Sequence, residues 1–305
     1  MTPNMSAKLF LRQASLPILT MTACALLMAC GGGDSAAPTI TAPTTGSPSY
    51  GQTLVLTLHG SDLDRGLAVT SSAACPGAAL VNKAPWLSTA TTAYYECTVA
   101  GIGAGAFVVK SAAGGGTLVT VPFTVPAPQV TMTLSNGAGV NGAVVVTLAP
   151  DRAPVTVNNF LVYVNAGFYG GTLIHRVVKD FVVQGGGYEG PIDASTVQAE
   201  TKPVNAPIVL EDKAGLSNTQ WTIGMARTNI PDSATSQFFI NLVDNSAALD
   251  ASPTQAGYAV FGSVTAGTDT VNTAVAAPCL PTFISGAGDC TPVPNVVITS
   301  ARQTR

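Results

Sequence analysis

Apolar residues recur at every second position in several short runs of this sequence, and this alternation limits the chain to folds built mainly from strands. A strand turns successive side chains to opposite faces, so a period of two is typical of a half-buried sheet. Glycine-rich breaks separate the runs. The clearest members are Leu54, Leu56 and Leu58, then Tyr95, Cys97 and Val99, and then Val119, Val121, Phe123 and Val125. We therefore expect a small β-sandwich over this part of the chain.

The C-terminal part of the sequence adds one clear helix to further strands. Pro154 suits the first turn of a helix, where its missing N–H costs nothing, and Gly167 suits the end. Between them an apolar stripe follows the helical period, and its members are Val157, Phe160, Leu161 and Val164. The segments "QWTIGMART", "SQFFINLV" and "GYAVFGSV" read as short buried strands. Many strands with few helices favour a barrel or sandwich capped by helices.

The charge of the chain excludes one class of partner. Its 305 residues carry a net charge of -3 at pH 7, and only 10% of them are charged. A protein that binds a phosphate backbone needs a basic face, so nucleic acid is not an expected partner. Thr, Ser, Asn and Gly supply the polarity instead, a composition common in exported β-rich proteins.

The N-terminus has the features of an export signal. Lys8 and Arg12 precede an uncharged run whose apolar end reads "ACALLMACGGGDS", as in a signal peptide. Within it, "LMAC" at 27–30 resembles the bacterial lipobox, which implies cleavage before Cys30 and a lipid on that cysteine. An ordinary signal peptide with an incidental cysteine is the alternative. We expect residues 1–29 to be the signal and Cys30 to anchor the protein in the bacterial envelope, facing the periplasm.

The segment after the cysteine suggests how the chain is organised. Residues 30–48 are rich in Gly, Pro, Ser and Thr without a hydrophobic period, so a flexible tether is expected there. Gly31 stands in place of the Asp that marks inner-membrane retention, which favours the outer membrane. We expect the sandwich domain over 49–126, where no catalytic constellation is found. A second domain is expected over 127–305, with "PAPQ" at the boundary.

Four cysteines remain once Cys24 leaves with the signal and Cys30 carries the lipid. An even number in an oxidising compartment predicts disulfides. The four fall in two distant segments, and loop closure favours the local pairs, Cys75 with Cys97 and Cys279 with Cys290. The sequence has no CxxC motif, so neither a redox site nor a zinc site is expected.

The stretch "GTLIHRVVKDFVVQGGGYEG" at 171–190 raises the question of chemistry. Its three glycines are not followed by the Lys and Ser or Thr of a phosphate loop, and His175 lies near no nucleophile motif, so hydrolysis is not favoured. A hairpin turning at Asp180 places Arg176 opposite Gln184, whose amide can then orient the guanidinium. On this segment alone, an exposed strand arginine is the alternative.

Three longer segments carry a resemblance to a known family. They are "VTVNNFLVYVNAGFYGGTLIHRVVKDFVVQGGGY", "TIGMARTNIPDSATSQFFINLVDNSAALD" and "GYAVFGSVTAGTDTVN". In this order, over about residues 129–299, the chain resembles cyclophilin-type peptidyl-prolyl isomerases, particularly the bacterial periplasmic branch. The resemblance implies a mainly β fold with an eight-stranded closed barrel capped by two helices. It also implies an enzyme that isomerises X-Pro bonds, with the substrate proline on the outer face of the barrel.

The resemblance assigns roles to individual residues. It implies that Arg176 is the catalytic arginine and that Gln184 positions it. It places the proline ring in an apolar pocket made of Phe181, Val182, Phe239 and Leu249. It implies further substrate contacts from Ala226, Arg227, Gln237 and Tyr258. Three positions differ from the common pattern, with Val182 in place of Met, Arg227 in place of Asn and Tyr258 in place of His.

No cofactor, metal or covalent intermediate is expected, because a catalyst of this reaction need only favour the twisted amide. The expected partners are proline-containing polypeptides of the envelope and, through the lipid, a membrane; the protein is expected to be monomeric. Two other hypotheses stay open: a non-catalytic peptide-binding or chaperone module, and a structural envelope lipoprotein. Because Cys279 and Cys290 follow every residue of the implied site, we expect reduction of their disulfide to leave the isomerase activity largely intact.

Overall fold

The structure is a computed structural model that describes residues 37–192, 200–281 and 289–305. The expected signal peptide, the lipidation site at Cys30 and the first residues of the expected tether lie outside the described residues. Residues 37–305 form one compact unit. Within the described ranges, none of the helices combines the length and the apolar character that a membrane crossing demands.

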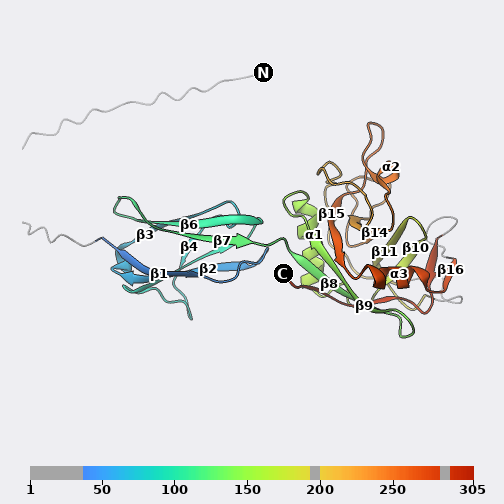
Figure 1. The fold of residues 1–305 in the computed structure, drawn as a ribbon, viewed down its shortest axis with the longest axis horizontal. Helices are drawn as coiled ribbons and strands as arrows, with labels where there is room; N and C mark the ends of the chain where they lie inside the picture. Colours follow the sequence, from blue (N-terminus) through green and yellow to red (C-terminus); the bar gives the residue numbers. More distant parts are fainter. Residues whose placement is uncertain (1–36, 193–199, 282–288) are drawn as a thin grey trace, which may run out of the picture. The chain divides into compact units, whose positions relative to one another are not determined.

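The N-terminal strands form a sandwich of two sheets around a shared core (Figure 1). A four-stranded sheet has the order β1-β2-β5-β4, and a three-stranded sheet has the order β3-β6-β7. Their bounds are β1 Thr39–Thr45, β2 Thr53–Ser61, β3 Leu67–Ser71, β4 Ala79–Val81, β5 Thr92–Thr98, β6 Gly103–Ser111 and β7 Thr117–Val125, with a 3-10 turn at Leu63–Arg65. Leu54, Leu56 and Leu58 of β2 pack with Phe107 and Val109 of β6. The alternation in the sequence therefore marks the buried face of each sheet.

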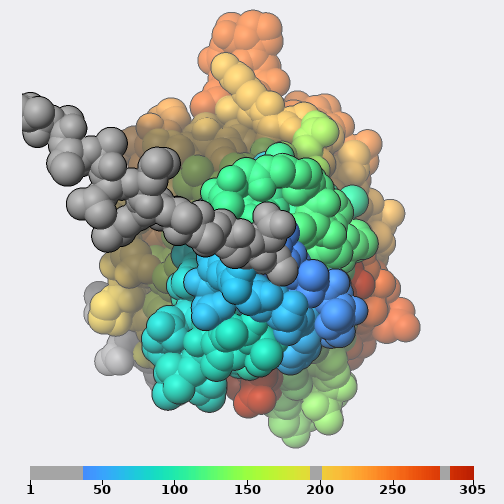
Figure 2. All heavy atoms as spheres, turned by 90° about the vertical axis from the view of Figure 1, so that its left-hand side faces the viewer, coloured from blue at the N-terminus to red at the C-terminus, as the bar shows by residue number. Residues whose placement is uncertain are grey.

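Figure 2 shows the atoms of the sandwich residues in blue to green. Strand β1 corrects a prediction. It occupies part of the segment that was expected to be a flexible tether. β1 pairs antiparallel with β2, from Thr39 opposite Ser61 to Thr45 opposite Leu56. None of its residues is fully buried, so it lacks the apolar alternation that identified the other strands. Pro43 is tolerated there because β1 lies at a sheet edge.

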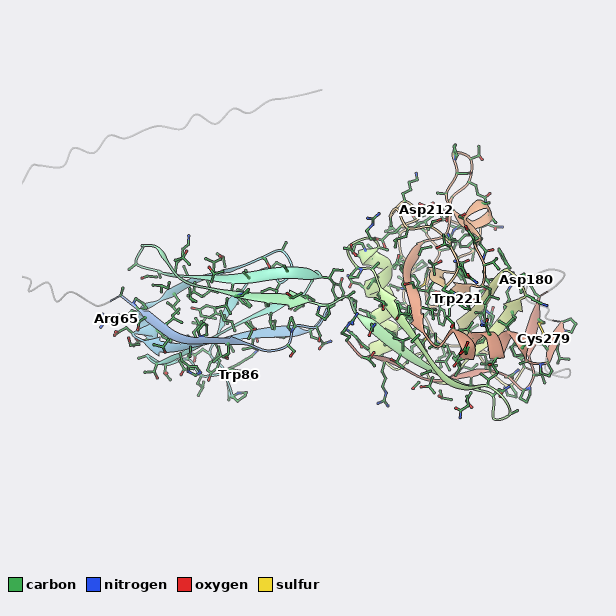
Figure 3. All side chains as sticks on the ribbon, viewed as in Figure 1. Arg65, Trp86, Asp180, Asp212, Trp221 and Cys279 are labelled. Atoms are coloured by element: carbon green, nitrogen blue, oxygen red, sulfur yellow. A yellow bond between two sulfur atoms is a disulfide. The ribbon has the colours of Figure 1, made fainter. Side chains whose placement is uncertain are left out.

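Both predicted disulfides are present. Cys75 is bonded to Cys97 and Cys279 to Cys290, and the two Cα atoms are 5.5 Å apart in each pair. The first bridge is buried in the sandwich core. The second joins two short strands at one margin of the other domain (Figure 3 labels Cys279).

The C-terminal strands close into a barrel of eight. Their order around the ring is β11-β14-β13-β15-β9-β8-β18-β10, and the pairing of β10 with β11 closes it. The bounds are β8 Gln129–Ser135, β9 Asn141–Leu148, β10 Thr172–Val178, β11 Val182–Glu189, β13 Thr222–Met225, β14 Phe238–Asn241, β15 Val260–Ala266 and β18 Val297–Gln303. Three short strands extend the margins, β12 Glu200–Thr201 beside β11, β17 Cys290–Pro292 beside β10, and β16 Cys279–Pro281 beside β17.

Two helices pack against this barrel, as the resemblance implied. They are α1 Pro154–Asn165 and α3 Thr268–Ala276, and α2 Ser246–Leu249 is a single turn. Pro154 stands at the start of α1 and Gly167 follows its end with φ of 68°. All four residues of the predicted stripe of α1 belong to the barrel core, together with Val271 and Ala274 of α3. The fold is therefore mainly β, with a closed barrel whose interior is filled by side chains.

Candidate active site

The hairpin of β10 and β11 has the predicted register. Arg176 pairs with Gln184, and Val178 pairs with Val182. Asp180 forms the turn with φ of 58° (Figure 3), a left-handed conformation that Asp adopts more readily than most residues. The two residues expected to carry the chemistry are therefore direct neighbours across the hairpin.

Two adjacent rows of side chains cross strands β10, β11, β14 and β13. The pairing of Arg176 with Gln184 continues to Phe239 and then to Gly224, and these four form the outer row. The next set of partners forms the inner row, which consists of Val177, Val183, Ile240 and Ile223. The whole inner row belongs to the barrel core. Because successive residues of a strand point to opposite faces, the outer row lies on the outside of the barrel.

Glycine is needed where two side chains lie flat on the outer face. A Cβ on Gly224 would stand 2.4 Å from Cζ of Phe239, and a Cβ on Gly187 would stand 2.4 Å from Cγ of Gln237. Carbon atoms cannot approach so closely, so any larger residue would displace the side chain above it. The glycine run in the middle of β11 thus makes room for the side chain of Gln237.

A chain of hydrogen bonds runs through the polar part of the site. Nη1 of Arg176 donates to Oε1 of Gln184 at 3.3 Å, and Nε2 of Gln184 donates to Oε1 of Gln237 at 2.9 Å. The guanidinium has only donors, which fixes the orientation of the Gln184 amide. The prediction that Gln184 orients Arg176 therefore has a direct geometric counterpart, and the side chain of Arg176 is only 18% exposed.

The second partner of Arg176 was missed from the sequence. Nε of Arg176 donates to Oδ2 of Asp289 at 2.7 Å, and Nη2 donates to Oδ1 at 3.3 Å. Asp289 directly precedes Cys290, so the Cys279–Cys290 bridge lies next to a partner of Arg176. Because Asp289 is 113 positions from Arg176, no local spacing in the sequence could have indicated the pair.

The apolar residues gather next to this polar chain. Phe239 is 4% exposed, and its ring meets that of Tyr258 edge to face at 5.7 Å between centroids. Val182 is buried in β11, and Phe181 is half-buried beside it. Leu249 ends α2, and its carbonyl oxygen accepts a hydrogen bond from the Tyr258 amide at 2.9 Å. These contacts place the rings of Phe239 and Tyr258 together as an aromatic wall.

The two residues expected to hold the peptide backbone have structural contacts of their own. The Ala226 amide donates to the carbonyl oxygen of Gln237 at 2.9 Å. The guanidinium of Arg227 donates to the carbonyl oxygens of residues 256 and 257 and lies over the Tyr258 ring, 4.4 Å from its centroid. The side chain of Arg227 thus braces the Tyr258 wall by hydrogen bonds and a cation–π contact.

A polar network that the sequence did not indicate supports this wall. Asp250 accepts hydrogen bonds from Ser217 Oγ and from the backbone and side-chain amides of Asn218. Burial raises the pKa of Asp250, but these hydrogen bonds together outweigh it and lower that pKa. Asn218 also donates to the carbonyl oxygen of Tyr258 at 3.3 Å. The network therefore ties the Tyr258 segment to the body of the domain.

His175 is in the wrong setting to be a general base. Its side chain is fully buried, with its ring 4.6 Å from that of Tyr188. Burial in particular lowers the pKa of His175 to about 4, and neighbouring Arg176 also disfavours the charged form. The imidazole is thus neutral at pH 7, because the Leu173 backbone and the Gln237 side chain, which favour its charged form, do not offset the burial. The expectation that it carries no hydrolytic role fits these surroundings.

Comparison with known proteins identifies the barrel. The model of the family "Cyclophilin type peptidyl-prolyl cis-trans isomerase/CLD" matches residues 130–303. A peptidyl-prolyl cis-trans isomerase of Acinetobacter baylyi is 48% identical over 131 residues, covering 43% of this chain and 65% of that protein. Peptidyl-prolyl cis-trans isomerase cyp18 of Streptomyces antibioticus is 45% identical over 163 residues, covering 53% of this chain and 92% of that protein.

A crystal structure of a Cryptosporidium parvum cyclophilin type peptidyl-prolyl cis-trans isomerase also matches, with a TM-score of 0.43 and 21% identity, covering 59% of this chain and 99% of that chain. The family model spans more than half of the chain, and the Streptomyces relative is matched over nearly its whole length. The chain belongs to the cyclophilin type peptidyl-prolyl cis-trans isomerase family.

Proposed function

We propose that the protein isomerises X-Pro peptide bonds and that Arg176 is its catalytic residue. An X-Pro bond crosses between trans and cis over a barrier of about 20 kcal/mol, because twisting destroys the resonance of the amide. A guanidinium near the proline nitrogen stabilises the lone pair that becomes localised there. The single observation that carries this proposal is the outer row. In this row Arg176 of β10 and Phe239 of β14 flank Gln184 of β11, so a guanidinium and an aromatic ring lie on the same face of the barrel.

The other pocket residues divide the remaining work. Phe239, Val182 and Leu249 offer an apolar surface for the proline ring, while Gln237 stands at the polar edge of that surface. Gripping the ring while the preceding residue rotates concentrates binding energy on the twisted state. The Tyr258 wall, braced by Arg227, keeps water from one side of the pocket, which strengthens every electrostatic contact inside it.

A kinetic comparison on the full chain tests the proposal. We expect Arg176→Ala to lower kcat/KM for a proline peptide by about 100-fold or more, the usual loss for one oriented donor in a desolvated site. The matched control is Arg302→Ala, since Arg302 is an exposed strand arginine of the same barrel. Equal rates for wild type and Arg176→Ala would refute the mechanism. Binding of the peptide without turnover by the wild type would instead indicate a peptide-binding module.

The place of action is a second part of the proposal. The protein acts on exported polypeptides, anchored by a lipid on Cys30 and facing the periplasm. Lys8, Arg12 and the lipobox-like residues 27–30 support export, and two disulfides fit an oxidising compartment. We expect Cys30→Ser to abolish labelling by radioactive palmitate, with Cys24→Ser as the matched control. Equal labelling of the wild type and Cys30→Ser would contradict the anchor.

A further inference from the structure

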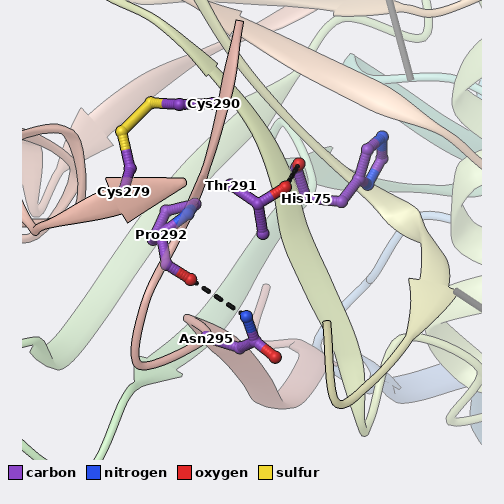
Figure 4. The surroundings of a disulfide bond; sticks show 6 residues. All are labelled: His175, Cys279, Cys290, Thr291, Pro292 and Asn295. Carbon is purple, nitrogen blue, oxygen red and sulfur yellow. Dashed lines mark hydrogen bonds between the residues drawn. A yellow bond between two sulfur atoms is a disulfide. The ribbon is translucent and has the colours of Figure 1, made fainter. Parts of the chain in front are cut away.

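The strand that directly follows Asp289, β17, is fixed against β10 at several points. Cys290 of β17 pairs with Val177 of β10, and Oγ of Thr291 donates to the carbonyl oxygen of His175 at 2.5 Å (Figure 4). The disulfide of Cys290 joins β17 to β16, beside their antiparallel pairing. Asp289 is therefore placed next to Arg176 by a short strand with covalent and hydrogen-bonded anchors.

The carboxylate of Asp289 grips one edge of the guanidinium. It accepts from Nε and Nη2 of Arg176, while Gln184 accepts from Nη1. Arginine has five N–H donors in a planar fork, so these three contacts leave two N–H groups for a substrate. The Asp289 side chain is only 6% exposed, and an ion pair removed from water in this bidentate geometry is strong and directional.

The side on which Asp289 contacts the Arg176 guanidinium decides whether this carboxylate assists the site or blocks it. β11 and β14, which carry Gln184 and Phe239, lie on one side of β10, and β17 lies on the other. The carboxylate thus holds the guanidinium from the side away from the proline pocket. We propose that Asp289 is a positioning residue, which fixes Arg176 in its catalytic orientation and rests on the isomerase function proposed above.

The physical reason is the freedom of an arginine side chain. Four rotatable bonds let an unrestrained guanidinium sample many orientations, and an electrostatic catalyst loses most of its effect when its donors are misplaced by about 1 Å. Gln184 holds a single nitrogen at 3.3 Å, which leaves rotation about that contact. The bidentate contact with Asp289 prevents this rotation of the guanidinium. The same carboxylate offsets the charge of a guanidinium that is largely removed from water.

A double-mutant cycle on the full chain tests this role. We expect Asp289→Ala to lower kcat about tenfold, equivalent to about 1.4 kcal/mol at the transition state, with KM changed less than twofold. In an Arg176→Ala background the same substitution should have no further effect on kcat. Asp289→Asn, which keeps the shape and one acceptor oxygen, should lose less than Asp289→Ala. The matched control is Asp151→Ala, an exposed acid on the same domain.

The outcomes separate this inference from the proposed function. An inactive wild type, or an Arg176→Ala variant as active as the wild type, would refute the isomerase mechanism itself. If Arg176 is essential but folded Asp289→Ala and Asp289→Asn have the wild-type kcat or a higher one, the positioning role is overturned. Equal losses of kcat from Asp289→Ala in the presence and absence of Arg176 would overturn it as well. Circular dichroism at the assay temperature shows which variants are folded.

The disulfide provides an independent readout that does not require a change at Asp289. Replacing Cys279 and Cys290 by serine removes the covalent anchor of β17, and we expect kcat to fall about threefold with KM unchanged. In an Asp289→Ala background the same replacement should leave kcat as it is. A loss of the same size in both backgrounds would show that the bridge supports the site without Asp289 and would overturn the link. The matched control replaces Cys75 and Cys97, whose bridge lies in the sandwich core.

Discussion

The inner and outer rows cross the same four strands, one residue apart, and carry opposite kinds of side chain. Val177, Val183, Ile240 and Ile223 form the inner row and are at most 3% exposed. Arg176, Gln184, Phe239 and Gly224 form the outer row, and no two of them are alike. Because the side-chain period of a strand is two, shifting any strand by one residue would exchange the rows. The apolar row therefore fixes the register, and the register assembles the site.

The comparison predicts that substitutions in the inner row mainly lower the free energy of unfolding, whereas substitutions in the outer row mainly lower kcat/KM. The largest expected effect is on the inner row, at Ile223, which is fully buried. We expect Ile223→Ala to lower the free energy of unfolding by about 4 kcal/mol, through lost burial and a residual cavity. Urea denaturation measures this loss. The kcat/KM of the folded fraction should stay within twofold, and a tenfold fall in that fraction would contradict the division between rows.

His175 lies beside both rows and links stability to pH. An unfolded histidine titrates near 6.5, whereas the pKa of His175 is about 4 in the folded protein. On acidification the unfolded state therefore binds the proton first, so stability is complete above pH 6.5 and is lost as the pH falls toward 4. The interval of 2.5 units corresponds to about 3 kcal/mol.

Urea denaturation of wild type and His175→Phe between pH 7 and pH 4 measures this contribution. We expect the wild type to lose about 3 kcal/mol more than the variant over that range. Because the imidazole is neutral in the folded state, His175 itself should impose no change on kcat between pH 8 and pH 5.5. Parallel stability curves for the two proteins would contradict the lowered pKa.

How far the sequence predicts the structure depends on the distance between partners. The hairpin around Asp180 is local, so alternation and a turn sufficed to pair Arg176 with Gln184. The partner at Asp289 is brought in by the pairing of β17 with β10 between distant parts of the chain, which no local pattern records. The strand at Thr39–Thr45 was missed because an edge strand with no fully buried residue has no apolar alternation. The pocket residues came from family resemblance, because single apolar residues on separate strands have no spacing of their own.

A third prediction concerns Gly224, the member of the outer row without a side chain. A methyl group there would displace the ring of Phe239, which stands 2.4 Å from the position of a Cβ. We expect Gly224→Ala to lower kcat/KM about tenfold and the free energy of unfolding by only about 1 kcal/mol, the lower end of the cost of overpacking. The control is Gly139→Ala, where nothing lies within 4 Å. Wild-type kcat/KM in Gly224→Ala would show that the position of the Phe239 ring is not critical.

The smallest effect should come from Val182, and it is compared with the equally buried neighbour Val183; the two are 2% and 3% exposed. Val183 belongs to the inner row, so Val183→Met must fit a longer side chain into a filled core, and we expect a loss of about 2 kcal/mol in the free energy of unfolding. Val182 lies outside that core and belongs to the proposed proline pocket. Val182→Met adds one heavy atom to the apolar wall, worth about 0.6 kcal/mol in contact with a substrate.

That contact would exist in the ground state and the twisted state alike, so it should lower KM about threefold and leave kcat unchanged. Steady-state kinetics on both variants, with urea denaturation beside them, checks the pair. If Val182→Met destabilised the protein as much as Val183→Met and left KM unaltered, Val182 would belong functionally to the core. The substitution by Met would then have the same effect at both positions. The division of the barrel wall into a row for folding and a row for catalysis would be wrong.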